Sequence, residues 1–315
     1  MASKILITDP LTLIGREFIR CLENAPDLAI EVDYRHTATD DEHQIAELGA
    51  KPALVPPLDD PVELAGLGIV VVTSDTETER TGHLENLLIR HPEVTLVDVS
   101  RLPRLAELTI PAIGETVGAT DRWHLRVAHP SLVAAAKILI ALEPLEPLRG
   151  SVAAVDPVSI FGRGALETMV EQAGRRIQGG EPERDIDGHV LAFNQVAVDA
   201  DALTEEAAEL IPNTPLAVTR TLSGSFHGHV AHIAIELAEP VDDPELRDAF
   251  DTVGDIVISE PPISLEVVPD RDHILLAPPQ LSPDRRIVSM TAMMDGLRLG
   301  GALTAIEILR AMTIN

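Results

Sequence analysis

The stretch KILITDPLTLIGREFIRCL (residues 4–22) decides the first part of the fold. Its apolar start, Ile5–Ile7, predicts a strand, and the apolar residues after the turn recur at helical spacing. A dinucleotide-binding unit begins with this order of strand, turn and helix, and it places three glycines in the turn. Here only the last glycine, Gly15, is present, while Asp9 and Thr12 stand in the earlier positions. We therefore expect the skeleton of a nucleotide-binding unit with an altered turn.

The first third of the chain continues this alternation of strands and helices. Short apolar segments predict strands at Leu28–Val32, Ile69–Thr73 and Val94–Val99. An amphipathic segment predicts a helix at Glu77–Arg90. Because short, fully apolar strands separated by helices form parallel sheets covered on both faces, we predict a doubly wound α/β domain over residues 1–125.

The remainder predicts a second α/β region that includes an antiparallel strand. A long apolar helix is expected to begin with Ser131 as its N-cap and to end at Pro144. A final amphipathic helix is expected at Gly300–Met312, after loops and short strands between Pro261 and Pro283. The other expected elements are strands at Val152–Val158, Ala217–Leu222 and Ala231–Leu237, and helices at Ala165–Ile177 and Pro244–Val257, the last capped by Asp243.

Composition limits the possible partners. The 315 residues include 51 acidic and 24 basic side chains, which give a formal net charge of −27. Such a charge repels nucleic acid and anionic lipid, so neither is expected as a partner. No apolar stretch approaches the roughly 20 residues that span a bilayer, and a single cysteine fits a reducing cytosol. We expect a cytoplasmic protein whose acidic surface is either simply solvated or an adaptation to high salt.

Five motifs, taken in order, resemble one family. They are VDVSRLPR (97–104), GRGALETMVEQ (162–172), LAFN (191–194), SFHGHVAHIAIE (225–236) and DGLRLGGALTAIEI (295–308). With this order and spacing the chain resembles aspartate-semialdehyde dehydrogenase over nearly its whole length. It is most similar to the Usg-like paralogues of that family, which lack the catalytic cysteine.

The resemblance implies a Rossmann-like NADP-binding domain at residues 1–125 and an α/β (α+β) dimerisation domain at 126–295. It further implies a C-terminal helix at 296–315 that returns to the first domain, and assembly as a homodimer. The family reaction is the NADP-dependent reductive dephosphorylation of aspartyl phosphate. A cysteine thiolate attacks the acyl phosphate, NADPH reduces the thioester, and a histidine moves protons.

The catalytic positions of the family are only partly kept. His229, in the segment FHGH, matches the proton-transferring histidine. Ser131 stands at the cysteine position, but an unassisted serine stays protonated near neutral pH, whereas a thiol with a pKa of about 8.5 needs only a modest shift. Cys21 lies in the first predicted helix and is no substitute. We therefore expect Ser131 to be a helix cap rather than a nucleophile.

The substrate-binding positions are also depleted. The resemblance places a substrate-clamping arginine at Leu222, and Arg220 lies two residues earlier on the same predicted strand. Glu205 belongs to a substrate segment whose lysine is missing, and Val158 stands where the family has an active-site glutamine. Arg104 either matches a phosphate-binding arginine or is a surface arginine in a proline-bounded loop.

NADP is the cofactor that the resemblance implies. The positions that would contact it are Thr12, Gly15, Thr73, Gly162, Asp295 and Arg298. Asp9 places a carboxylate near the pyrophosphate, and two negative charges about 4 Å apart repel by about 1 kcal/mol even in bulk water. Pro10 also removes one backbone donor. We therefore expect NADP to bind weakly or not at all.

Three neighbouring histidines, His227, His229 and His232, are candidate metal ligands. Alternation along a strand places the first two on one face and the third on the other, so a three-ligand site needs a bulge. We predict no metal site.

The sequence thus favours a catalytically inactive relative of aspartate-semialdehyde dehydrogenase, with a structural or regulatory role as a homodimer or in a pair with an active paralogue. Two alternatives stay open. One is an active NAD(P)-dependent oxidoreductase that acts on an aldehyde or acyl substrate in amino-acid biosynthesis, with His229 as the base and either Ser131 or a metal-bound water as the nucleophile. The other is a small-molecule sensor that uses the former substrate pocket.

Overall fold

The computed structural model describes residues 3–39, 43–48, 51–58, 66–76, 78, 80–100, 102, 105, 108–119, 124–268 and 272–314. The chain forms two compact units. Unit 1 comprises Met1–Ala128 together with Gly301–Asn315, and unit 2 comprises His129–Gly300. Among the described residues, no helix combines the length and the hydrophobicity needed to cross a bilayer.

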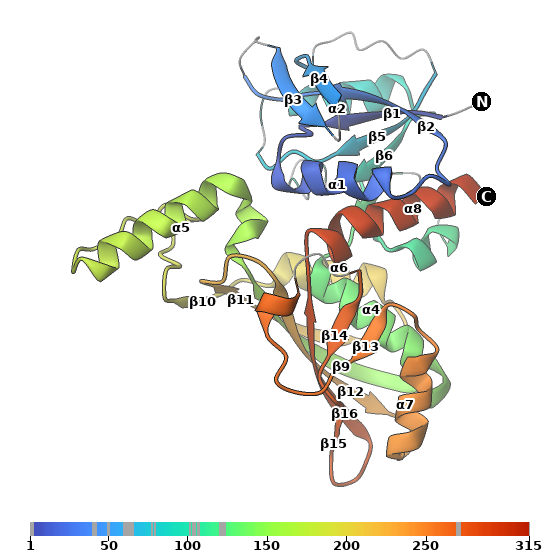
Figure 1. The fold of residues 1–315 in the computed structure, drawn as a ribbon. Helices are drawn as coiled ribbons and strands as arrows, with labels where there is room; N and C mark the ends of the chain where they lie inside the picture. The colour runs from blue at the N-terminus through green and yellow to red at the C-terminus, as the bar shows by residue number, and fades with distance from the viewer. Residues whose placement is uncertain are drawn as a thin grey trace. The chain divides into compact units, whose positions relative to one another are not determined.

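Unit 1 is built on a six-stranded parallel sheet with the strand order β2-β1-β5-β6-β8-β7 (Figure 1). A separate two-stranded ribbon pairs β3 with β4. The strands are β1 (Ser3–Thr8), β2 (Ile30–Arg35), β3 (Gln44–Leu48), β4 (Lys51–Val55), β5 (Leu67–Val72), β6 (Thr95–Asp98), β7 (Ile110–Ala112) and β8 (His124–Val127). The helices are α1 (Leu13–Glu23), α2 (Thr81–Arg90), the 3₁₀ helix η1 (Gly114–Ala119) and α8 (Leu303–Ile314).

Both faces of this sheet are buried. Ile5 and Ile7 of β1 pack with α1 and α8 in one apolar cluster, whereas Leu6, which points to the other face, packs with α2 in a second cluster. This two-sided burial is the reason why the strands are nearly continuous apolar runs rather than alternating ones. The expected doubly wound domain is confirmed, and the C-terminal helix α8 belongs to it, as expected.

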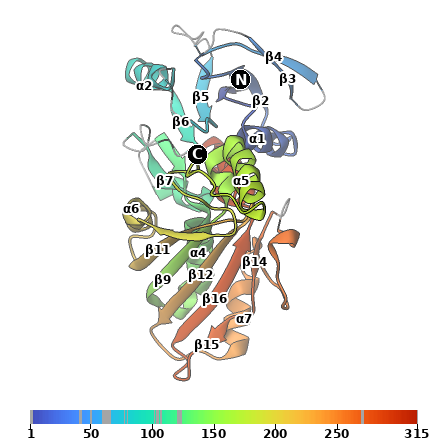
Figure 2. The same ribbon diagram turned by 90° about the vertical axis from the view of Figure 1, so that its left-hand side faces the viewer.

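Unit 2 contains an eight-stranded mixed sheet with the order β10-β11-β9-β12-β16-β14-β13, and β15 pairs with β16 (Figure 2). Its strands are β9 (Pro147–Asp156), β10 (Gln195–Val198), β11 (Leu216–Ser223), β12 (His229–Leu237), β13 (Ile256–Ile258), β14 (Ile274–Leu276), β15 (Gln280–Leu281) and β16 (Ile287–Met294). Its α-helices are α4 (Pro130–Leu142), α5 (Gly162–Ile177), α6 (Asp201–Leu210) and α7 (Asp243–Asp251). Shorter helical turns are η2 (Glu143–Leu145), η3 (Val158–Phe161), η4 (Leu265–Val267) and the π-helical η5 (Arg298–Ala302).

The two faces of the central strands of unit 2 differ. On β12, His229, Ala231, Ile233, Ile235 and Leu237 are buried, and α4 packs against β9 and β12. The intervening positions are exposed or half-buried, which is the alternation expected of a sheet with one covered face. We name eight of these positions, in the middle of β9, β12 and β16, the open face: Ser151, Ala153, Val155, Val230, His232, Ala234, Ser289 and Thr291.

Two helix starts differ from the sequence prediction. The apolar helix α4 is capped by His129, whose ring accepts a hydrogen bond from the Ser131 N–H, so Ser131 lies inside the helix and is not its cap. Helix α7 is capped by Asp242 rather than Asp243, because Asp242 and Glu245 form a reciprocal capping box. The predicted helix over Pro244–Val257 is also too long, since α7 ends at Asp251 and strand β13 follows.

Candidate functional site

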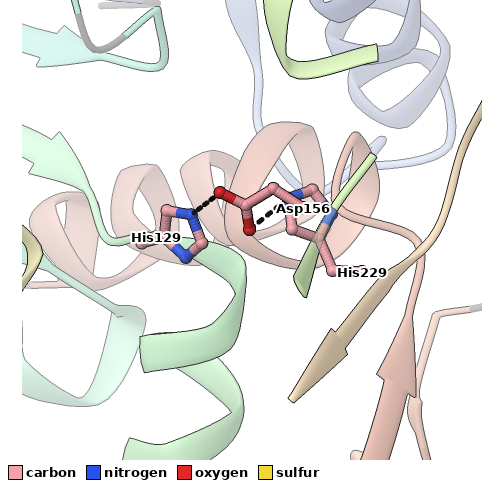
Figure 3. A group of neighbouring side chains, drawn as sticks. All are labelled: His129, Asp156 and His229. Atoms are coloured by element: carbon pink, nitrogen blue, oxygen red, sulfur yellow. Dashed lines mark hydrogen bonds and ion pairs between the residues drawn. The ribbon is translucent and has the colours of Figure 1, made fainter. Parts of the chain in front are cut away.

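Three buried side chains of unit 2 meet at one end of its sheet, with the carboxylate of Asp156 between the imidazoles of His129 and His229 (Figure 3). The Asp156 Oδ2 lies 3.2 Å from His129 Nε2, and its Oδ1 lies 3.8 Å from His229 Nε2. The two imidazole rings are arranged edge to face, with centroids 5.6 Å apart. The exposed fraction is 5% for His129, 0% for Asp156 and 3% for His229.

The ends of three elements place these side chains. His129 caps α4, Asp156 is the last residue of β9, and His229 is the first residue of β12. Gly296 makes room for the cluster, because a Cβ at that position would overlap the His229 imidazole. Gly300 has a φ of +80°, and a Cβ there would lie 2.5 Å from the Cα of Pro130. Both glycines therefore allow the chain to pass close beside the cluster.

The hydrogen bonds of His129 determine which of its nitrogens carries the proton. Its Nδ1 accepts the Ser131 N–H at 3.2 Å, so Nε2 carries the proton and donates it to Asp156 Oδ2. The backbone N–H of His129 donates to the buried carboxylate of Glu206 at 2.5 Å. His129 is thus held at both its ring and its backbone.

Asp156 is a buried anion. Arg220 Nε donates to the same Oδ2 at 2.7 Å, and the Arg220 side chain is 30% exposed. Burial alone raises the pKa of the Asp156 carboxyl, but attraction to His129, His229 and Arg220 and the His129 hydrogen bond outweigh it. The pKa of Asp156 is therefore held well below the usual range for an aspartate.

The spacing of the three ligand atoms would also suit a metal ion, but their hydrogen bonds do not. A metal at His129 Nε2 would need the lone pair of a nitrogen that carries the proton, and Arg220 already bonds to the carboxylate. The arrangement fits a hydrogen-bonded ion cluster better than a cation site. The histidine group considered from the sequence is different, since His229 is buried on β12 while His232 is exposed.

Ser131 is enclosed in the start of α4. It is fully buried, and its Oγ has no hydrogen-bond partner among the described residues. Within the described part of the chain no general base lies in hydrogen-bond distance of this Oγ, and a buried hydroxyl without a base stays protonated. The single cysteine of the chain, Cys21, lies in α1 of unit 1. Unit 2 consequently contains no thiol.

The structure distributes the predicted substrate residues unevenly. Arg220 reaches the cluster, whereas Leu222 is buried in an apolar cluster that also contains Val158. Glu205 is exposed on α6, and it is the next residue, Glu206, that contacts His129.

Asp156 was missed by the sequence reasoning. Its signal was a lone acidic residue at the end of the apolar run SVAAVDP (residues 151–157). A charge at the end of a buried strand needs partners, and here it has them.

The predicted NADP turn of unit 1 is occupied by the chain itself. Thr12 Oγ1 accepts the Gly15 N–H at 3.0 Å and donates to the Thr73 carbonyl at 2.7 Å. The Asp9 carboxylate accepts the N–H and the hydroxyl of Thr37 at 2.7 and 2.6 Å. Gly15 allows close packing, because a Cβ there would lie 2.5 Å from the Asp9 carbonyl oxygen. With these donors used and a carboxylate in place, the turn does not fit a pyrophosphate group.

The other predicted cofactor residues have local partners. Gly162 begins α5 with a φ of +80°, a conformation that favours glycine. Asp295 Oδ1 accepts the Leu297 N–H, and the buried Arg298 donates to Asp272. Any contact of these residues with NADP stays a prediction. Arg104 lies outside the described residues.

Comparison with known proteins gives a match at the level of structure. No family model and no curated protein sequence matches the chain. Among solved structures, aspartate semialdehyde dehydrogenase II from Vibrio cholerae, in complex with ASA, is similar with a TM-score of 0.83 and 15% identity. The match covers 100% of this chain and 99% of that one.

Two further solved structures are similar in the same way. A probable aspartate-semialdehyde dehydrogenase from Pseudomonas aeruginosa has a TM-score of 0.84 and 17% identity, with 99% of each chain covered. The Francisella tularensis enzyme has a TM-score of 0.80 and 11% identity, covering 99% of this chain and 100% of that one. The chain is thus a two-unit α/β protein, and its fold is that of the aspartate-semialdehyde dehydrogenases. The resemblance expected from the sequence is confirmed for the fold.

Proposed function

We propose that this protein does not catalyse the cysteine-dependent reductive dephosphorylation of aspartyl phosphate, and that it has a structural or regulatory role as a homodimer. One observation carries the proposal. Where the resembling family needs a thiolate beside a proton-transferring histidine, unit 2 has a fully buried serine, and His229 faces the anionic carboxylate of Asp156. The chain keeps the fold and lacks the nucleophile.

The charge of Asp156 adds to the loss of the thiol. An acyl phosphate is an anion, and so is the thiolate that would attack it. A buried carboxylate beside His229 repels both, and a charge interaction is stronger in a buried site than in water. Replacing Ser131 alone therefore does not restore the reaction.

The open face of unit 2 supports the homodimer. Its eight residues carry no charge apart from the titratable His232, and the charged residues next to them on the same face, Arg149 and Glu236, form an ion pair with each other at 2.7 Å, although the whole chain carries a net charge of −27. An uncharged sheet face on a strongly acidic protein suits another uncharged face, and a two-fold axis brings the same face of a second copy against it.

The test of the catalytic proposal uses an introduced thiol. The Ser131→Cys variant and the wild type are assayed for NADP-dependent oxidation of aspartate semialdehyde, each also with Cys21→Ala to remove the native thiol. We expect no turnover above the protein-free rate in any of the four. Turnover in the wild type would favour an active oxidoreductase instead, and turnover gained by Ser131→Cys alone would show that the rest of the site is competent.

The molar mass of the protein in solution tests whether it is a homodimer. Light scattering after size exclusion is expected to give twice the chain mass for the wild type and a monomer for Ala153→Arg, which places a charge in the middle of the open face. Glu209→Arg, on the exposed side of α6, is the control and should remain a dimer. A dimeric Ala153→Arg protein, or a monomeric wild type, would contradict this interface.

A further inference from the structure

The strand order of unit 1 has a switch point between β1 and β5, the place where open parallel sheets form a crevice at the ends of their strands. The chain proceeds from β1 to β2 on one side and from β5 to β6 on the other, so the direction of winding reverses between β1 and β5. In open parallel sheets, ligands bind at such a reversal, outside the carboxyl ends of the strands. Asp9 follows β1 directly, and Thr73 and Ser74 follow β5. These residues therefore occupy the position where this fold places a ligand.

Several donors in this crevice converge on one carboxylate of the chain. Asp9 accepts the Thr37 N–H at 2.7 Å, the Thr37 hydroxyl at 2.6 Å and the Ser74 hydroxyl. Thr37 follows β2, so the donors come from the ends of two strands that flank β1. A backbone N–H and two hydroxyls around an anion are also the donor types that proteins use to bind phosphate groups.

The backbone holds Asp9 in an unusual conformation. Its φ is +48°, in the left-handed region that glycine adopts freely and other residues seldom do. The Asp9 N–H donates to the Arg35 carbonyl at 2.7 Å, which ties the turn to the end of β2. A residue type suited to this backbone would be glycine, so the aspartate is kept there by the contacts of its side chain.

We propose that the crevice is an oxyanion-binding cradle whose resident anion is the Asp9 carboxylate, and that removal of this carboxylate opens it to phosphate groups. The ligand class is a phosphate, either inorganic or carried by a nucleotide. In the wild type the cradle is closed by the chain's own side chain, which excludes such ligands.

The surroundings show that the donors are held in place without Asp9. The Thr78 hydroxyl donates to the Thr37 carbonyl at 2.7 Å, and the Thr8 and Ser74 hydroxyls lie 3.2 Å apart. The neighbouring carboxyl of Asp75 reports the charge of Asp9, since loss of solvent and that negative charge raise the pKa of Asp75. Neither of these two hydrogen bonds involves Asp9, so both stay available to hold Thr37 and Ser74 when the carboxylate is removed.

The experiment measures binding of inorganic phosphate to the full chain by isothermal titration calorimetry at constant ionic strength. Asp9→Gly, which accepts the left-handed backbone, is expected to bind phosphate at least about tenfold more tightly than the wild type, a difference of about 1.4 kcal/mol. Adding Thr37→Val removes one hydroxyl donor and should abolish the gain. Glu31→Gln, which removes an exposed charge from the same unit, is the control and should bind like the wild type.

A second measurement shows where the phosphate binds, and a second variant is available if the first one does not fold. Hydrogen exchange of the peptide that contains Thr37 should be slow in the wild type, faster in Asp9→Gly, and slow again when phosphate is added. If Asp9→Gly does not fold, Asp9→Asn, which tolerates the same backbone without the charge, replaces it in the titration.

Two results would overturn the inference. One is phosphate binding to the wild type as tight as to Asp9→Gly, and the other is a folded Asp9 variant with no gain. Neither readout uses the reaction centre of unit 2, so failure here leaves the proposed function standing, and turnover in unit 2 leaves this inference standing.

Discussion

Asp9 in unit 1 follows the last residue of strand β1, and Asp156 in unit 2 is the last residue of strand β9. Both side chains are carboxylates, but their surroundings differ. Asp9 is half-buried and takes its hydrogen bonds from neutral hydroxyls and one backbone N–H. Asp156 is fully buried and is surrounded by two histidines and an arginine. The first carboxylate accepts hydrogen bonds from neutral groups, and the second is the counter-charge of the Arg220 guanidinium and the hydrogen-bond acceptor of His129.

The two carboxylates are therefore built into the fold with different strength. Removal of a carboxylate from among neutral donors leaves hydroxyls and an N–H that need new partners, which costs less than leaving a buried charge unpaired. Removal of a carboxylate from a buried ion cluster leaves positive groups without their counter-charge, which is far more costly. The Asp9 carboxylate is therefore expected to be replaceable, whereas the Asp156 carboxylate is part of the core of unit 2.

The largest effect is expected at Asp156. Asp156→Ala should lower the free energy of unfolding by about 3–5 kcal/mol, because it leaves His129 and Arg220 without a buried acceptor. Urea denaturation of the full chain measures this change, and Asp248→Ala on the exposed side of α7 is the matched control with a change within about 0.5 kcal/mol. A loss below about 1 kcal/mol at Asp156 would erase the contrast between the two carboxylates.

The contribution of Asp156 should also be visible in the pH dependence of the free energy of unfolding. Because the pKa of Asp156 is lower in the folded chain than in the unfolded chain, its stabilisation is present above pH about 4 and is lost as pH falls toward the folded pKa. The wild type should thus lose about 2–3 kcal/mol more than Asp156→Asn does between pH about 5 and strongly acidic conditions. If the free energy of unfolding of the wild type and of Asp156→Asn changed with pH in the same way, the pKa of Asp156 would not be lowered in the folded chain.

An intermediate case is the pair of Lys137 and Asp255. Lys137 is buried in the apolar helix α4, and its Nζ lies 2.5 Å from the carboxylate of Asp255, whose side chain is 38% exposed. Asp255→Ala should cost about 1–2 kcal/mol, since it removes the counter-charge of a buried ammonium. Lys137→Met should cost less, because the remaining carboxylate reaches water. If urea denaturation gave equal losses of unfolding free energy for Asp255→Ala and Lys137→Met, burial of Lys137 would not determine the cost of breaking the pair.

The smallest effect on stability is expected for Asp9→Gly. It loses the hydrogen bonds from Thr37 and Ser74 but relieves a left-handed backbone and the repulsion from Asp75. These contributions offset one another, so the free energy of unfolding should change by no more than about 1 kcal/mol. A loss as large as that of Asp156→Ala would show that Asp9 is a structural anchor rather than a replaceable anion.

The fold could be predicted because the sequence patterns that indicate its strands and helices are local and recur along the chain. The apolar runs near residues 5, 70 and 96 mark buried parallel strands, and the helix that contains Gly15 shows one apolar face. The cap of α4 was mistaken because a serine before an apolar run is the commoner N-cap, whereas here the His129 ring takes that role. Element order could be inferred from the sequence, and the exact helix starts depended on side-chain contacts.

The site was harder to predict because its residues are far apart in sequence. His229 could be picked out from a motif, but Asp156 is 73 positions earlier, and nothing local shows that it lies between two histidines. Likewise, Glu205 and Glu206 cannot be told apart until the helix phase shows which one is buried. Such pairings arise when the sheet of unit 2 assembles.

We infer that the candidate site of unit 2 contains a buried anion, Asp156, beside His129 and His229. Carbon-13 NMR of the side-chain carboxyl groups, with Asp156→Asn used to assign the signal, measures this most directly. The account predicts that Asp156 is still ionised at pH about 3, below the usual aspartate pKa of about 3.9. A titration midpoint at or above pH about 4 would contradict it.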